Sequence, residues 1–79
     1  MYPSGTQIRA ARALLKMSRE ELASLAGVSE RTITNLEETD RKPIRATIEA
    51  VMGSLIGQGI RFLPPDPETG AGPGVRIDR

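Results

Sequence analysis

Apolar residues recur at helical spacing along the first two thirds of the chain. Ile8, Ala11 and Leu15 are separated by three and four residues, a spacing that places them on one face of a helix. Thr6 stands just before this run and is expected to be its N-cap. We therefore predict a first helix that follows Thr6 and continues to about residue 16, with residues 1–5 outside it.

Two short helix patterns follow in residues 17–37. Ser18 and Glu21 have the spacing of a capping box, in which each side chain binds the backbone amide of the other residue. Leu22 begins an apolar face, and Gly27 can adopt the left-handed conformation that ends a helix without a Cβ clash. The pattern predicts a second helix that starts at Arg19 and ends before this glycine.

Ser29 is the expected N-cap of a third helix. Ile33 and Leu36 give this helix an inward stripe. The outward face is left with four polar residues, which are Glu30, Arg31, Thr34 and Asn35. Two helices joined by a short glycine turn form a helix-turn-helix unit.

A further helical stripe follows Pro43, and its members are Ile44, Ile48, Val51, Met52 and Leu55. We interpret them as the core face of a fourth helix that closes over the first and third helices and ends at Gly57. Gly53 weakens this helix locally and is expected to allow a close contact.

The end of the chain changes in character. Ile60 and Phe62, and later Val75 and Ile77, alternate with polar residues, and residues 64–73 between them are rich in Pro and Gly. This pattern favours a short β-hairpin over a disordered tail. An isolated hairpin is marginal in water, so it has to pack on the helices or pair with a second subunit.

The predicted fold is therefore mainly α. Residues 1–57 form a four-helix domain of helix-turn-helix type, and residues 58–79 form a C-terminal β-hairpin or tail that is expected to serve in dimerisation. The residues expected to contact a second subunit are Ile60, Phe62, Val75 and Ile77.

From about residue 7 to residue 55, the chain resembles the phage-repressor-like helix-turn-helix family of Cro/CI, or xenobiotic-response-element, type. The residues that carry the resemblance are Leu22, Ala23, Gly27, Val28, Ser29, Thr32, Ile33, Leu36 and Glu37. The resemblance implies a DNA-binding domain, and it implies an ion pair between Arg12 and Glu37 that ties the first helix to the end of the third. The chain departs from the family pattern at Arg19, where Gln is frequent, and at Thr39, where a Gly often follows the third helix.

Composition restricts the chemistry. A chain of 79 residues is one small domain in which burial is marginal, so a partner subunit is expected. It has no Cys and no His, which argues against a disulfide framework and the usual zinc sites. Without a Gly-rich phosphate loop or a histidine base, we expect neither an enzyme nor a cofactor.

The formal charge of +1 is by itself a weak argument for nucleic acid. The distribution is uneven, because Arg9, Arg12 and Lys16 stand in an N-terminal segment without acids. No apolar run approaches the roughly 20 residues of a membrane span, and the N-terminus lacks a signal-peptide core. A cytoplasmic protein without membrane contact is expected.

A helix fits the major groove of B-DNA, where side chains near its N-terminus reach base edges. The base-contacting candidates are Glu30, Arg31, Thr34 and Asn35, and Arg31 is the foremost of them. Glu30 has an alternative role, because an acid in the first turn stabilises the helix dipole. The phosphate-contacting candidates flank this helix and are Ser18, Arg19, Arg41 and Lys42, although Lys42 can equally be a solvated loop charge.

We predict a sequence-specific DNA-binding transcription regulator, acting as a repressor, that binds an operator of two half-sites as a homodimer. Dimerisation is inferred from the size of the chain and from the resemblance. The alternative is a helix-turn-helix fold that binds protein, as an antiactivator or an antitoxin. The low net charge and the acidic cluster of Glu37, Glu38 and Asp40 favour this alternative.

Overall fold

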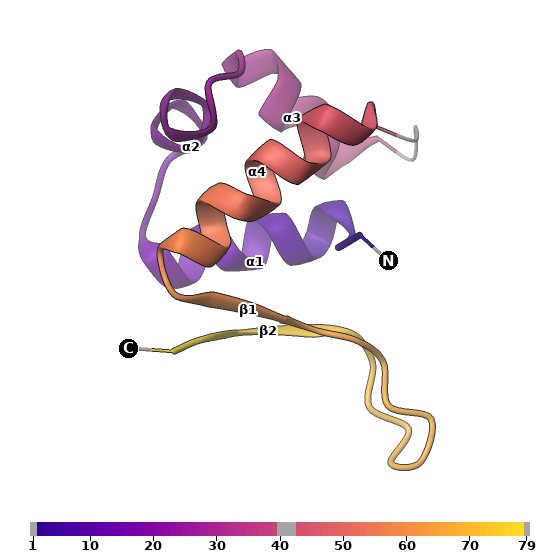
Figure 1. Ribbon diagram of the computed structural model, residues 1–79. Coiled ribbons are helices and arrows are strands. Elements are labelled where there is room, and N and C mark those ends of the chain that lie inside the picture. Colours follow the sequence, from indigo (N-terminus) through magenta and orange to yellow (C-terminus); the bar gives the residue numbers. More distant parts are fainter. Residues whose placement is uncertain (1, 40–42, 79) are drawn as a thin grey trace.

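The computed structural model describes residues 2–39 and 43–78, which form four helices and one β-hairpin (Figure 1). The elements are α1 (Gly5–Leu15), α2 (Arg19–Ala26), α3 (Glu30–Glu38), α4 (Arg45–Gly57), β1 (Ile60–Leu63) and β2 (Gly74–Ile77). This confirms the mainly helical fold with a C-terminal hairpin that the apolar pattern predicts. None of the described helices is long and apolar enough to cross a membrane.

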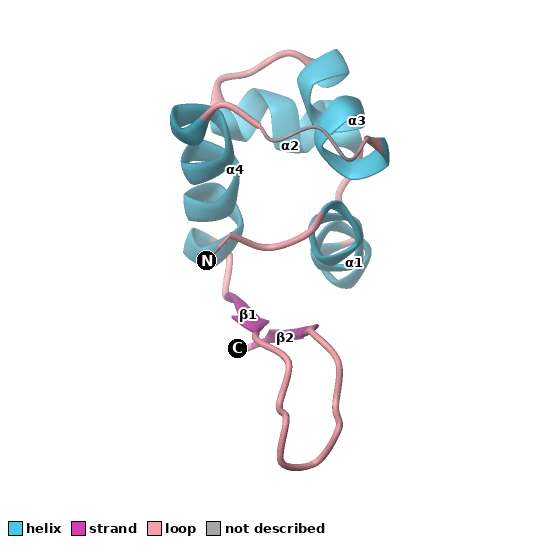
Figure 2. Cartoon of the chain, turned by 90° about the vertical axis from the view of Figure 1, so that its right-hand side faces the viewer, coloured by secondary structure: helices cyan, strands magenta, loops and turns pink. Residues whose placement is uncertain are grey.

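The four helices enclose a small apolar core. Its largest fully buried side chains come from all four helices and are Ile8, Leu22, Ile33, Ile48, Val51 and Leu55. α2 and α3 lie at one end of the body, and the hairpin lies beyond α1 and α4 at the other end (Figure 1). The side view in Figure 2 gives the same order. The hairpin is therefore remote from the outward surface of α3.

α1 begins earlier than the sequence predicts. Its N-cap is Ser4, whose hydroxyl accepts a hydrogen bond from the amide of Gln7 (3.2 Å). The side-chain oxygen of Gln7 in turn accepts from the amide of Ser4 (2.8 Å). Thr6, the expected N-cap, lies inside the first turn. Ser4 and Gln7 thus form a capping box, with glutamine in the position that Glu21 has in α2.

Gly5, the first residue of α1, is pressed against the end of α3. A Cβ placed on Gly5 would lie 2.8 Å from the Cα of Glu37 and would overlap the carbonyl oxygen of Leu36. Side chains do not approach backbone atoms this closely, so the absence of a Cβ is what allows α1 and α3 to pack. Gly5 thus lies inside α1 and against α3, although the apolar pattern leaves it outside the helix.

α3 ends without a left-handed residue. Thr39 has an extended backbone (φ −117°, ψ 151°), and both its amide and its hydroxyl donate to the carbonyl oxygen of Asn35 (3.1 and 2.7 Å). The carbonyl oxygen of Asn35 thus accepts both a backbone hydrogen bond and the bond from the threonine hydroxyl, and the helix ends without a glycine turn.

Three expectations for α4 are wrong. α4 packs mainly against α2, with a smaller contact to α1, and does not close mainly over α1 and α3. Ile44 precedes the helix as its N-cap and is 75% exposed, whereas the pattern placed it in the core. Gly53 makes no close contact, because a Cβ placed on it would meet nothing within 4 Å. Ile48, Val51 and Leu55 are buried, as the stripe predicts.

β1 and β2 pair antiparallel, with Ile60 opposite Ile77 and Phe62 opposite Val75. Ile60 is 3% exposed and belongs to the core, and the other three side chains pack against that core while half-buried. The hairpin therefore packs on the helices of its own subunit, which is one of the two ways to stabilise it. Ile60 is inaccessible to a partner in this packing, so only the outer face and the edges of the hairpin are open to a second subunit.

Gln7 anchors the hairpin to α1. Its side-chain amide donates to the carbonyl oxygens of Leu63 (3.3 Å) and Gly74 (3.0 Å), which stand opposite each other at the end of the strand pair. Gln7 is 9% exposed, and both its side-chain oxygen and its side-chain nitrogen are hydrogen-bonded. Gln7 thus belongs to the capping box of α1 and also binds the hairpin.

Beyond the strands the chain forms an arm, residues 64–73, that points away from the helices (Figures 1 and 2). An isolated bridge joins Asp66 and Ala71 near its tip, where the amide of Asp66 donates to the carbonyl oxygen of Ala71 (2.8 Å). The carboxylate of Asp66 also accepts from the amide of Glu68 (3.0 Å). The arm contains these two acids and no basic residue.

Candidate nucleic-acid interface

The N-terminus of α2 is capped as its sequence predicts. The hydroxyl of Ser18 accepts from the amide of Glu21 (3.0 Å), and the carboxylate of Glu21 accepts from the amide of Ser18 (3.1 Å). Hydrogen bonds from the backbone and the side chain of Ser18 lower the pKa of Glu21 below its ordinary value. Ser18, a phosphate-contacting candidate, is exposed, but its hydroxyl accepts the capping hydrogen bond of α2.

The turn between α2 and α3 depends on Gly27. This residue has the left-handed conformation (φ 73°), and the next amide, that of Val28, donates to the carbonyl oxygen of Ala23 (3.0 Å). Ser29 then caps α3, because its hydroxyl accepts from the amide of Thr32 (3.1 Å). These local bonds set the direction in which α3 leaves the turn.

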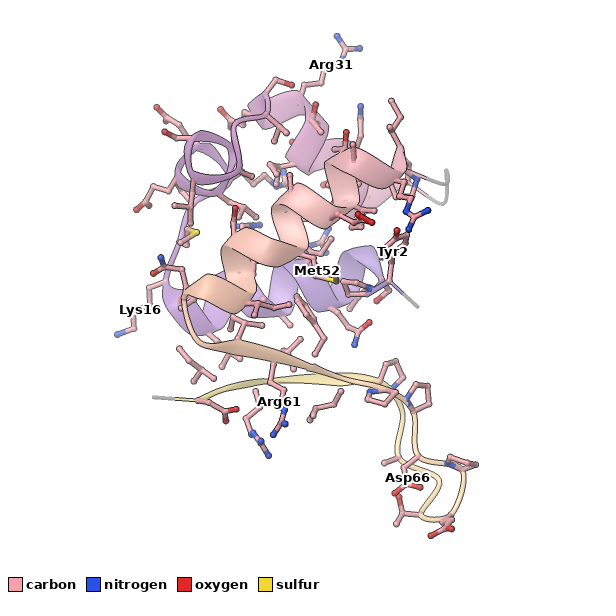
Figure 3. All side chains as sticks on the ribbon, in the orientation of Figure 1. Tyr2, Lys16, Arg31, Met52, Arg61 and Asp66 are labelled. Atoms are coloured by element: carbon pink, nitrogen blue, oxygen red, sulfur yellow. The ribbon has the colours of Figure 1, made fainter. Side chains whose placement is uncertain are left out.

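α3 presents a polar face to solvent. Glu30, Arg31 and Asn35 are exposed, and Thr34 is half-buried with its hydroxyl donating to the carbonyl oxygen of Glu30 (3.2 Å). Arg31 points away from the body, at the opposite end from Arg61 of the hairpin (Figure 3). The structure thus brings the four base-contacting candidates together on one accessible helix face.

A hollow of about 590 Å³ lies between α3 and the start of α4. Its lining includes Arg31, Asn35, Thr39, Ile44 and Thr47. Ile44 places an exposed apolar side chain beside two base-contacting candidates, and such a group can contact a thymine methyl. The sequence pattern missed this residue because it counted Ile44 with the core stripe. No local signal separates Ile44 from the stripe, because it stands four residues before Ile48, which is the spacing of a core face.

Glu37 is the centre of a charged network at the edge of this face. Its side chain is 0% exposed, and Arg12 donates to both of its carboxylate oxygens (2.6 and 2.8 Å). Burial raises the pKa of Glu37, but the hydrogen bonds and charges of Arg12 and Arg19 outweigh burial and lower the pKa below its ordinary value. The Arg12–Glu37 pair joins α1 to α3, as the resemblance implies.

Arg19, the first residue of α2, is directed towards α3. Its Nε donates to Glu37 (3.2 Å) and its Nη2 donates to Glu38 (2.9 Å). The bond to Glu38 is the largest cause of a raised pKa of Arg19, followed by the bond to Glu37. Arg9 approaches the same two carboxylates at 3.7 and 3.8 Å. A guanidinium assigned by its position to DNA phosphate is thus held by carboxylates of its own chain.

The two remaining phosphate-contacting candidates, Arg41 and Lys42, lie outside the described residues. Arg19 and Arg31 are the basic residues of α2 and α3, and these helices also carry five acids, which are Glu20, Glu21, Glu30, Glu37 and Glu38. The charge of the described interface is therefore mixed, and does not by itself attract nucleic acid.

A family model described as Helix-turn-helix matches residues 8–50, which is more than half of the chain. The chain belongs to this helix-turn-helix family. The match covers α2, the turn and α3 completely, together with most of α1 and the first part of α4. No curated protein matches the chain. The family consists of DNA-binding transcription regulators of Cro/CI, or xenobiotic-response-element, type, and this helix-turn-helix protein is a regulator of that class.

Proposed function

We propose that this protein is a repressor that binds, as a homodimer, an operator with two related half-sites. Each half-site is read by α3 in the major groove. The observation that carries this proposal is the polar, accessible face of α3 beside a properly capped helix-turn-helix turn, with Arg31 extended away from the body.

Each candidate on this face has a base edge that it fits. Arg31 can form a fork with O6 and N7 of guanine, Asn35 can bind N6 and N7 of adenine, and Glu30 can accept from N4 of cytosine. The hydroxyl of Thr34 is engaged with the carbonyl oxygen of Glu30. The methyl group of Thr34 is therefore the part that remains for a thymine methyl.

Phosphate contacts on either side of the groove would position α3. Ser18 and the amides at the start of α2 lie on one side, and Arg19 contributes once it leaves its carboxylate partners. Arg41 and Lys42, in the connection between α3 and α4, are proposed for the other side. Cationic side chains that bind phosphate release counterions from the DNA, so affinity should fall as the salt concentration rises.

Two subunits are proposed because one helix reads only a few base pairs. The subunit measures 38 × 30 × 18 Å, so two subunits side by side can place their α3 helices about 34 Å apart, which is one turn of DNA. The hairpin is the proposed contact between subunits. Its outer face carries Arg61 opposite Arg76, and its arm carries Asp66 and Glu68. The arginines of one copy can therefore pair with the acids of the other copy.

Arg31→Ala tests base reading, once an operator has been selected from a pool of random DNA with the full chain. The variant should lose about 1 to 3 kcal/mol of binding free energy on the operator and change little on unrelated DNA. Lys16→Gln, which removes an exposed charge at the end of α1, is the control and should leave both affinities unchanged. Equal losses on both DNAs for Arg31→Ala would show that Arg31 binds phosphate instead.

A second candidate function is protein binding by the same fold. The observation in its favour is the mixed charge of the interface, where Arg19 is already paired with Glu37 and Glu38. Salt distinguishes the two functions, because a DNA complex that neutralises several phosphates weakens steeply as salt rises. Retention of a protein partner in salt, together with no binding to selected DNA, would support the second candidate.

A further inference from the structure

Glu38 lies on the face of α3 that would meet DNA. Glu30, Thr34 and Glu38 are four residues apart, so they follow one another along the same side of the helix. The side chain of Glu38 is 49% exposed. An acid in this place repels the phosphate backbone of DNA of any sequence.

The carboxylate of Glu38 is bonded to Arg19, one of the residues proposed above to contact DNA phosphate. Nη2 of Arg19 donates to Glu38 at 2.9 Å, and Nη2 of Arg9 lies 3.8 Å from the same oxygen. The side chain of Arg19 is 29% exposed, so it is accessible to a ligand from solvent. A DNA phosphate can therefore reach Arg19, but in the free protein its Nη2 is bonded to a carboxylate.

Glu37 and Glu38 differ in how easily a DNA phosphate could replace them as partners of the arginines. Glu37 is fully buried and takes two hydrogen bonds from Arg12, so its loss would leave Arg12 without its partner. Glu38 is exposed at the surface and bonds only through Arg19 among the described hydrogen bonds. A DNA phosphate can replace Glu38 without disturbing the packing of α1 on α3.

We propose that Glu38 competes with DNA phosphate for Arg19 and thereby limits the affinity of this protein for DNA of any sequence. This inference rests on the proposed function. In the free protein Glu38 neutralises Arg19, and on binding Arg19 exchanges one anion for another. Operator DNA supplies base contacts that offset this exchange, whereas unrelated DNA supplies phosphate contacts only. Glu38 thus keeps non-specific binding weak.

Glu38→Gln tests the inference directly. The full chain and the variant are titrated against an unrelated duplex over a series of salt concentrations. Since one phosphate contact changes the slope of log affinity against log salt by about 0.9, the variant should show a slope steeper by about that amount and an affinity about five to ten times higher at 0.1 M salt. The thermal transition of the variant should remain close to that of the parent, because exposed ion pairs contribute little to stability.

Two further variants show whether the effect passes through Arg19. Glu38→Gln combined with Arg19→Gln should lose the gain in affinity that Glu38→Gln gives alone. Glu20→Gln is the matched control, because it removes an exposed acid next to Arg19 that does not hold the guanidinium. Its effect should be small and should persist when Arg19→Gln is added.

Three results would overturn the inference. Unchanged affinity and slope for Glu38→Gln would show that Arg19 is not limited by this carboxylate. A gain in affinity from Glu38→Gln that persists when Arg19→Gln is added would show that the loss of a negative charge, and not the release of Arg19, raises the affinity. Weaker binding to the operator alone would show that Glu38 reads a base. If neither the parent nor any variant binds DNA, the proposed function fails as well, whereas binding by the parent with an unchanged Glu38→Gln overturns the inference only.

Discussion

A carboxylate that has lost all contact with water is stable only while its cationic partners stay in place. Glu37 is in this situation, because its side chain is 0% exposed and its oxygens are bonded to Arg12 and Arg19. The side chain of Arg12 is itself only 15% exposed. Removing one partner of such a buried ion pair leaves the charge of the other partner poorly compensated. This costs more stability than the intact pair contributes in net free energy.

Glu37→Gln should therefore lower the free energy of unfolding by about 3 kcal/mol, measured by urea denaturation near neutral pH. Glu49→Gln is the control. Glu49 pairs with Arg45 on the surface of α4 (3.0 Å), and this variant should lose less than about 1 kcal/mol. Similar losses in the two variants would show that burial of Glu37 adds nothing.

The same comparison has a defined pH dependence. The folded pKa of Glu37 is lowered from its ordinary value, so its stabilisation is complete above the unfolded pKa of about 4.3 and is lost as pH falls through the folded pKa. The stability difference between the parent and Glu37→Gln should be constant above about pH 5 and should shrink in more acidic solution. A difference that stays constant into strong acid would contradict the lowered pKa.

Two glycines in helices predict opposite responses to alanine. Gly5→Ala should destabilise the protein by about 1 to 3 kcal/mol, because a Cβ there meets the backbone of Leu36 and Glu37. Gly53→Ala should stabilise it by about 1 kcal/mol, because alanine is the better helix former and a Cβ there meets nothing within 4 Å. Thermal unfolding of the two variants should move in opposite directions, and a raised transition temperature for Gly5→Ala would contradict the packing of α1 on α3.

At the scale of elements, the hairpin and α1 stabilise each other through Gln7. An isolated hairpin of this length is marginal, and here it gains apolar contacts from Ile60 and its neighbours together with two hydrogen bonds from the Gln7 amide. Those bonds go to Leu63 and Gly74, at the point where the strands end and the arm begins. The bonds from Gln7 therefore hold the strand pair at the end next to the arm.

Gln7→Glu separates the two roles of this residue. A glutamate keeps the capping box with Ser4 but cannot donate to the carbonyl oxygens of Leu63 and Gly74. Hydrogen exchange should speed up in the hairpin while the first turn of α1 keeps its protection, with a loss of overall stability of about 1 to 3 kcal/mol. Gln58→Glu, at the exposed end of α4, serves as the control. Unchanged exchange in the hairpin of Gln7→Glu would show that apolar packing alone holds it.

At the scale of the whole molecule, the reading face and the hairpin lie at opposite ends. The arm extends further in the direction away from α3 (Figures 1 and 3). Removing the whole tail after Gly57 would strip Ile60 from the core, so loss of dimerisation and loss of folding could not be told apart in such a variant. The arm, by contrast, lies outside the buried core of the described residues.

The arm can be removed alone, because Leu63 and Gly74 are cross-strand partners. Replacing residues 64–73 by Asn-Gly closes the strands with a two-residue turn and should leave the thermal transition close to that of the parent. If the arm and the outer face join two subunits, the dimer should weaken about tenfold or more in sedimentation, a loss of about 1.4 kcal/mol. A folded variant with an unchanged dimer would place the interface on the helices.

Interactions within a few residues of the chain could be predicted from the sequence. Ser18, Gly27 and Ser29 act through bonds that reach no further than about one helical turn, so their spacing alone sets the helix-turn-helix unit and the outward face of α3. The alternation of Ile60 with Phe62 similarly predicts a strand with one buried face.

Tertiary packing decided what local spacing leaves open. Gln7 binds Leu63 and Gly74 because the hairpin packs beside the start of α1, and Arg19 binds Glu37 and Glu38 because the start of α2 packs beside the end of α3. In each case the deciding contact joins residues distant in the chain. Periodicity shows which side of a helix or strand is apolar. It does not show which other element will pack on that side, or which residues a nearby charged side chain will contact.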